Sequence, residues 1–166
     1  FEKQLRQKDA AKQLKAEAIL DDGLKELKRG KVDEAIILLE IANEMFPMPM
    51  ANLYIAWAKL KQHSDEVIPD NVAQLVQNTI NTTPADYRKI PEFYHVQGLF
   101  SLAKGDPSSA VQFFEKALSE DSSFIEARRE LSAIKSESKT SPTISEILSG
   151  DLSVVISGIF NKKKSS

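Results

Sequence analysis

The residues of this chain that could carry out chemistry are few, and their spacing does not form a catalytic or metal-binding motif. Neither His63 nor His95 has a second histidine or a cysteine at metal-ligand spacing. The absence of cysteine excludes thiol catalysis, disulfides and thiolate metal sites. Adjacent carboxylates such as Asp21 and Asp22 are typical of a solvated face, and no phosphate loop or nucleophile elbow is present. We therefore expect no enzyme, no metal site and no cofactor.

The charge balance argues against a second class of function. Lys and Arg number 22 against 24 Asp and Glu, which gives a formal net charge of -2. A nucleic-acid-binding domain normally shows a basic excess. No apolar run approaches the ~20 residues that span a bilayer, and the first residues do not resemble a signal peptide. We expect a cytoplasmic protein whose partner is a protein or peptide and not a nucleic acid.

Two stretches of the sequence repeat one pattern of small and apolar residues. Small residues on facing helices allow the helices to approach closely, and a glycine suits the end of a helix, where positive φ is favoured. Asp33 and Asp106 are candidate N-caps of the helices that follow. The matched positions are Gly23, Gly30, Ala35, Leu39 and Ala42 in the first stretch and Gly98, Gly105, Ala110, Phe114 and Ala117 in the second. Each stretch is predicted to fold as a helical hairpin.

This pattern resembles the tetratricopeptide repeat (TPR), a helix-turn-helix unit of ~34 residues. A third, divergent copy fits between the two clear ones, with helices at "MANLYIAWAKLKQ" and "DNVAQLVQNTINTTP" and with Trp57 in the usual place of glycine. A single helix over "SFIEARRELSAIKSES" would cap the array, and the first helix is expected to begin several turns before Gly23. The resemblance implies an all-α, right-handed TPR-like superhelix of antiparallel helix pairs, with about three repeats and seven helices.

A narrower resemblance rests on the order of "YIAWAKLK", "HVQGLFSLAKGDPSSAVQFFEKAL", "EARRELSAIKS" and "SGIFNKKK". It is similar to the C-terminal TPR regions of multidomain bacterial proteins that carry a DnaJ-like J domain upstream. This implies adaptor work beside a domain that recruits a chaperone, although this chain has no His-Pro-Asp motif of its own. The expected organisation is a TPR array with capping helix over 1–137, a linker with a short helix over 138–150, and an amphipathic tail with terminal lysines over 151–166.

The first helix of each TPR pair lines a concave groove, so its inward positions are the candidate partner-binding residues. TPR domains that clamp acidic C-termini place Lys and Asn at such positions, whereas this chain has Leu20 and Leu24. We therefore expect a non-catalytic scaffold or adaptor that captures an apolar helix or peptide. The alternative is that these leucines pack against the extended first helix as core. The predicted groove residues are Leu20, Leu24, Leu27, Tyr54, Ala58, Lys61, His95, Leu99, Leu102 and Arg129.

The tail carries an apolar stripe with helical periodicity, formed by Leu152, Val155, Ile156, Ile159 and Phe160. Its β-branched residues and a glycine weaken the helix, so we expect it to order only on an existing surface. Four hosts remain open: the groove of the same chain in a monomer, the groove of a neighbour in a tail-swapped dimer, a partner protein, and an anionic membrane. Binding to a membrane would use the lysines and would make the chain a membrane-surface adaptor, which is the alternative function. The lysines concerned are Lys162, Lys163 and Lys164.

Overall fold

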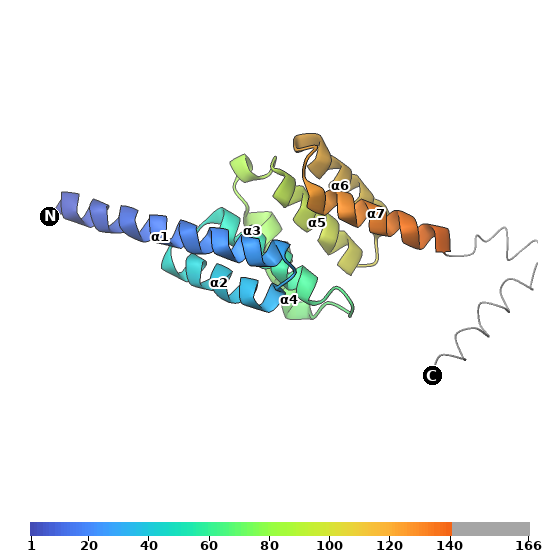
Figure 1. Cartoon of the computed structure of the whole chain (residues 1–166), viewed down its shortest axis with the longest axis horizontal. Coiled ribbons are helices and arrows are strands. Elements are labelled where there is room, and N and C mark those ends of the chain that lie inside the picture. Colours follow the sequence, from blue (N-terminus) through green and yellow to red (C-terminus); the bar gives the residue numbers. More distant parts are fainter. Residues whose placement is uncertain (141–166) are drawn as a thin grey trace, which may run out of the picture. The chain divides into compact units, whose positions relative to one another are not determined.

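Residues 1–140 are the part of the chain that the computed structural model describes, and they are entirely helical apart from turns (Figure 1). Residues 1–129 form one compact unit, and Glu130 begins a second, of which the structure describes residues 130–140, the larger part of the last helix. The predicted all-α fold and the seven helices of the array are confirmed. The elements are α1 (Glu2–Lys28), α2 (Val32–Met45), α3 (Pro49–Gln62), α4 (Asp70–Thr82), η1 (Ala85–Tyr87), α5 (Pro91–Ala103), α6 (Pro107–Glu120) and α7 (Ile125–Thr140).

The two clear repeats form helical hairpins, in which α1 lies along α2 and α5 lies along α6 (Figure 1). Glycine makes the close approach possible in both. A Cβ atom added at Gly23 would lie 2.8 Å from Cδ2 of Leu39, and one added at Gly98 would lie 2.4 Å from Cε1 of Phe114. Both facing side chains are fully buried. They fill the space that the missing Cβ atoms leave, and this tight packing fixes the spacing of each hairpin.

The divergent middle repeat supplies the centre of the array. Its first helix, α3, packs against both α2 and α5 and buries eight of its fourteen residues. Its second helix, α4, buries only Val72 and Val76. Trp57, which stands where the other repeats have glycine, is 3% exposed and lies among aromatic side chains. The large side chain therefore acts as core between repeats.

The longer loop after α4 provides the C-terminal cap of that helix. Arg88 follows η1, and its Nε donates to the carbonyl oxygen of Thr83 at 2.8 Å. Its Nη2 donates to the carbonyl oxygen of Asn81 at 3.0 Å. A guanidinium at this end of a helix satisfies free carbonyl groups and is favoured by the helix dipole. The inserted residues thus terminate α4 without the glycine that follows α1 and α5.

The turns after α1 and α5 need glycine for its backbone conformation, whereas the helix interiors need it for close packing. Gly30 has φ 82° and Gly105 has φ 76°, and a Cβ atom at either would meet nothing within 4 Å. The cost of a side chain here is therefore conformational. We expect Gly105→Ala to lower the free energy of unfolding by about 1 kcal/mol, and Gly105→Asn to lower it by less, because asparagine tolerates the left-handed region. Urea denaturation measures both; equal stability of Gly105→Ala and wild type would contradict the prediction.

One of the two predicted N-caps is confirmed and the other is wrong. Asp106 caps α6, because its Oδ1 accepts a hydrogen bond from the backbone N–H of Ser109 at 3.0 Å. Hydrogen bonds from the Ser109 side chain and backbone lower the pKa of the Asp106 carboxyl. Asp33 instead lies inside the first turn of α2, where it accepts a hydrogen bond from Nε2 of Gln62 at 2.8 Å. Proline at the first position of α6 fixes where that helix begins, and α2 has no such residue.

Candidate protein-interaction surface

The structure buries most of the side chains that were predicted to line the concave groove. Six of the ten are in the core: Leu20, Leu27, Tyr54, Ala58, His95 and Leu99. The predicted apolar wall therefore serves largely as packing between helices, which is the alternative that the sequence left open. The remaining four, which we call the inner-face residues, are Leu24, Lys61 and Leu102, which are partly exposed, and Arg129, which is exposed.

An aromatic cluster fills the space between the second and third repeats. The ring of His95 lies edge-on to Trp57, with 4.6 Å between ring centroids. Phe124, just before α7, and Phe114 of α6 lie 5.4 Å and 5.5 Å from the same ring. We call Trp57, Phe114 and Phe124 the aromatic box. It closes around His95 and leaves no access for a substrate, so this histidine is not placed to act as a catalytic base.

His95 is held in its neutral form by these surroundings. The side chain is fully buried, and within residues 1–140 neither ring nitrogen has a hydrogen-bond partner. Burial, and secondarily the nearby positive charge of Lys61, lowers the pKa of His95 to about 3. An imidazolium would lose its hydration here and gain no compensating hydrogen bond. At neutral pH the His95 ring therefore packs as an apolar group, whereas at acidic pH its burial lowers the stability of the folded chain.

Carboxylates from two other helices lie near the buried tyrosine of α3. Burial raises the pKa of Tyr54 above its usual range, and the negative charges of Glu92 and then Asp21 add to this rise. Asp21 belongs to α1 and Glu92 to α5, so one aromatic side chain is under the influence of both neighbouring first helices. Glu92 was not predicted as a functional residue, and Asp21 was interpreted only as part of a solvated face. The surface beside the buried leucines is therefore acidic as well as apolar.

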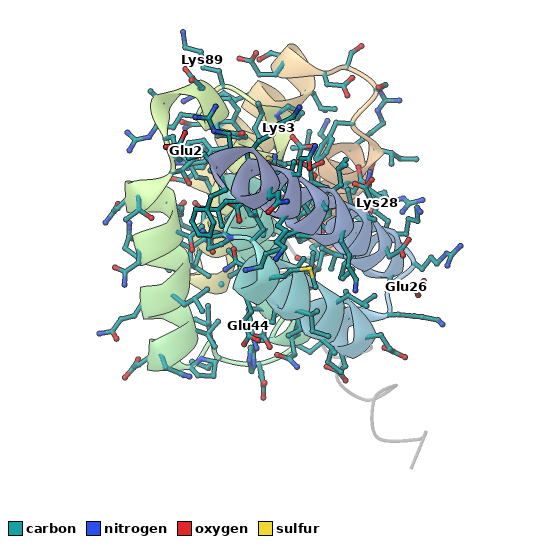
Figure 2. All side chains as sticks on the ribbon, turned by 90° about the vertical axis from the view of Figure 1, so that its left-hand side faces the viewer. Glu2, Lys3, Glu26, Lys28, Glu44 and Lys89 are labelled. Carbon is teal, nitrogen blue, oxygen red and sulfur yellow. The ribbon has the colours of Figure 1, made fainter. Side chains whose placement is uncertain are left out.

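An ion pair joins the end of the first helix to the start of the last. Nζ of Lys28 lies 3.3 Å from Oε1 of Glu126, whose side chain is 12% exposed. Glu26 and Lys28 project from the same end of α1, away from the Glu2 and Lys3 end (Figure 2). Glu26 pairs with Arg29 and Lys31 across the turn that follows. Charged residues thus border the inner face at this end, and their charges are largely balanced within the molecule.

A shallow pocket lies elsewhere, between the α2–α3 turn and the end of α4. Its walls include Pro47, Pro49, Thr79 and Thr82, and no titratable side chain lines it. Among residues 1–140 there is also no group of three or more histidine, cysteine or acidic side chains that could hold a metal ion. The hydroxyls of the pocket's three threonines, Thr79, Thr82 and Thr83, already donate to carbonyl oxygens of α4.

Known structures identify the arrangement of these helix pairs. The chain is similar to the first TPR domain of human RPAP3, with a TM-score of 0.51 and 23% identity over 73% of this chain and 90% of that one. It has a TPR-like fold. It is also similar to the first TPR of Spaghetti (RPAP3) bound to the HSP90 peptide SRMEEVD, with a TM-score of 0.50 and 23% identity over 76% and 95% of the two chains. No family model and no curated protein matches the sequence.

The inner-face residues are spread over successive units of the TPR-like fold, and Lys61 and Leu102 occupy matching positions, four residues after Trp57 and Gly98. Leu24, Lys61, Leu102 and Arg129 belong to α1, α3, α5 and α7, the first helices of the three pairs and the capping helix. The predicted docking tail, with its apolar stripe and terminal lysines, lies outside the described residues. No helix among residues 1–140 has the length and apolar character needed to cross a bilayer. The narrower resemblance to bacterial J-domain proteins stays a prediction.

Proposed function

We propose that this chain is a non-catalytic protein-interaction module, a scaffold or adaptor that holds an apolar helix or peptide along its inner face. The observation that carries this proposal is the accessibility of the inner-face residues on the first helices of three successive pairs and on the capping helix. A TPR-like fold presents such helices side by side, so that one extended partner can contact each repeat. The buried leucines beneath keep these four positions fixed.

The chemistry of the inner face favours a partner whose main contacts are apolar. Leu24 and Leu102 offer partly exposed aliphatic surface, and Lys61 and Arg129 are the two basic residues among the four. Spaghetti, the similar TPR structure, binds an acidic HSP90 peptide. Binding a terminal carboxylate calls for several converging cationic or amide donors. In this chain Leu20 and Leu24 take two such positions, and Asp21 and Glu92 add negative charge, so we expect apolar side chains to be preferred.

The test is a pair of charge substitutions that should remove binding and keep the fold. Peptides selected from a display library for binding to the full chain are measured by calorimetry. We expect Leu24→Glu with Leu102→Glu to weaken binding at least about tenfold, because two apolar contacts of about 1 kcal/mol each are replaced by desolvated charge. Leu99→Glu is unsuitable, since Leu99 is buried and a charge there would unfold the chain.

The matched control is Leu75→Glu, which places the same charge on the exposed side of α4. Its affinity should equal that of the wild type, and circular dichroism should give the same helix content for all variants. A peptide ending in SRMEEVD serves as the contrasting probe and should bind more weakly than the selected apolar peptides. Retained affinity in the double variant, or preferential binding of SRMEEVD, would overturn the proposal.

A further inference from the structure

The outer side of α2 exposes two large aliphatic side chains one helical turn apart. Ile37 is 58% exposed and Ile41 is 43% exposed. The opposite side of the same helix is occupied by Ala35, Leu39 and Ala42, which are fully buried in the hairpin. The two isoleucines are therefore not needed for the contact with α1. Together they form a small apolar patch of the kind on which the apolar face of another helix can pack.

The charge of α2 is one-sided. The helix has four carboxylates and no lysine or arginine. Two of the carboxylates are engaged: Asp33 accepts a hydrogen bond from Gln62, and Glu40 lies 3.4 Å from Nζ of Lys59. The other two, Glu34 and Glu44, are exposed, and no ion pair to either is formed within residues 1–140.

These residues follow one another on one side of the helix in the order Glu34, Ile37, Ile41 and Glu44, and we call them the α2 outer face. Spacings of three and four residues place side chains along a single stripe of an α-helix. The stripe is an aliphatic centre with a negative charge at each end. It calls for an occupant that has an apolar stripe and a positive charge beside it.

The C-terminal segment of this chain has that chemistry. Its apolar stripe runs from Leu152 to Phe160 with helical spacing, and Lys162, Lys163 and Lys164 follow directly. The groove that the sequence suggested as its host has most of its apolar residues in the core, whereas Ile37 and Ile41 are open to solvent. We propose that residues 152–164 dock on the α2 outer face, with the apolar stripe on the two isoleucines and the lysines beside Glu34 or Glu44.

Zero-length carbodiimide cross-linking of the full chain, mapped by mass spectrometry, tests this contact directly. The reagent joins a lysine to a carboxylate only when they are in contact. We expect links from Lys162, Lys163 or Lys164 to Glu34 or Glu44. Mixing ¹⁴N-labelled and ¹⁵N-labelled protein shows whether the segment comes from the same molecule or from a second copy, and either origin fulfils the proposal. Links mainly to Glu115 on α6, or to Glu92 and Glu126 near the inner face, would overturn it.

Matched variants test whether the isoleucines hold the segment. Ile37→Ser with Ile41→Ser should lower the yield of these links about fivefold or more, because the aliphatic contact is lost while every reacting group remains. Ile125→Ser, which removes an isoleucine of similar exposure from α7, should leave the yield unchanged. The reciprocal change, Ile156→Ser with Phe160→Ser, alters only the segment and should lower the yield equally. An unchanged yield in either double variant would contradict the proposal.

Discussion

Acidification from pH 7 to pH 4.5 should cost the wild-type chain about 2–3 kcal/mol of stability that a His95→Leu variant does not lose. The unfolded chain binds a proton at His95 near its ordinary pKa of 6.5, whereas burial lowers the pKa in the folded chain to about 3. Between these values the unfolded state holds more protons, so the free energy of unfolding falls by up to about 1.4 kcal/mol per pH unit. The contribution is fully present above pH 6.5 and is lost as the pH falls towards 3.

Urea denaturation at several pH values measures this effect, and the comparison with His95→Leu removes the changes caused by all other groups. Leucine suits the aromatic box because it is similar in volume and needs no hydrogen-bond partner. At pH 7 the variant should be about as stable as the wild type, since the two ring nitrogens of His95 have no partner to lose. The control is His63→Leu, because His63 lies in the turn after α3 beside Glu66. If the free energy of unfolding changed with pH in the same way for the wild type and His95→Leu, the prediction would be wrong and the ring would have to be hydrated.

Gly98→Ala is the second substitution with a large expected effect. The added methyl group would lie 2.4–2.8 Å from three atoms of the Phe114 ring, which is rigid and fully buried. Overpacking of this kind costs about 1–3 kcal/mol and exceeds the gain of at most about 1 kcal/mol that alanine brings to a helix. We expect a net loss of about 1–2 kcal/mol, measured by urea denaturation at pH 7.

Two further variants separate the clash from other effects. Gly23→Ala should cost less, because its added methyl group meets the flexible end of Leu39 at 2.8 Å and not a rigid ring. In the Gly98→Ala background, Phe114→Leu should cost less than it does in the wild type, since the smaller side chain relieves the clash. The coupling energy of this double-mutant cycle reports the contact itself. Additive effects would contradict the packing described for α5 and α6.

The helix pairs were predictable because the same pattern of small and large apolar residues occurs twice in the sequence. The glycine precedes the large residue by sixteen positions in both stretches, Gly23 before Leu39 and Gly98 before Phe114. In the structure each glycine packs against the large residue of its own stretch. Asp106 was predictable for a similar local reason, because a proline follows it. Asp33 has no such neighbour, and its engagement with Gln62 of α3 joins residues that are distant in the sequence. Local patterns therefore fixed the helices more reliably than the contacts of single side chains.

The exposed residues of the inner face were harder to predict, because a side chain at an inward position of a repeat can still be buried. Tyr54 and His95 occupy inward positions, but Trp57 stands where the pattern has glycine and brings a large ring beside both. Phe124, just before the capping helix, packs against the rings of Trp57 and His95. The sequence shows that Trp57 is anomalous but not where its ring lies. The α2 outer face was not predicted, because the partner-binding positions of a TPR lie on the first helix of each pair and α2 is a second helix.

The ion pair between Lys28 and Glu126 has a consequence for cooperativity. In a linear array each repeat contacts only its neighbours, so the ends can open independently of each other. Here the end of α1 and the beginning of α7 share a contact, although almost the whole array separates them in sequence. Loosening of either end removes a partner from the other. Because Lys28 is half-exposed, the ion pair couples the two ends of the array by about 1 kcal/mol at most. It is nevertheless a contact of a kind that a linear array otherwise lacks.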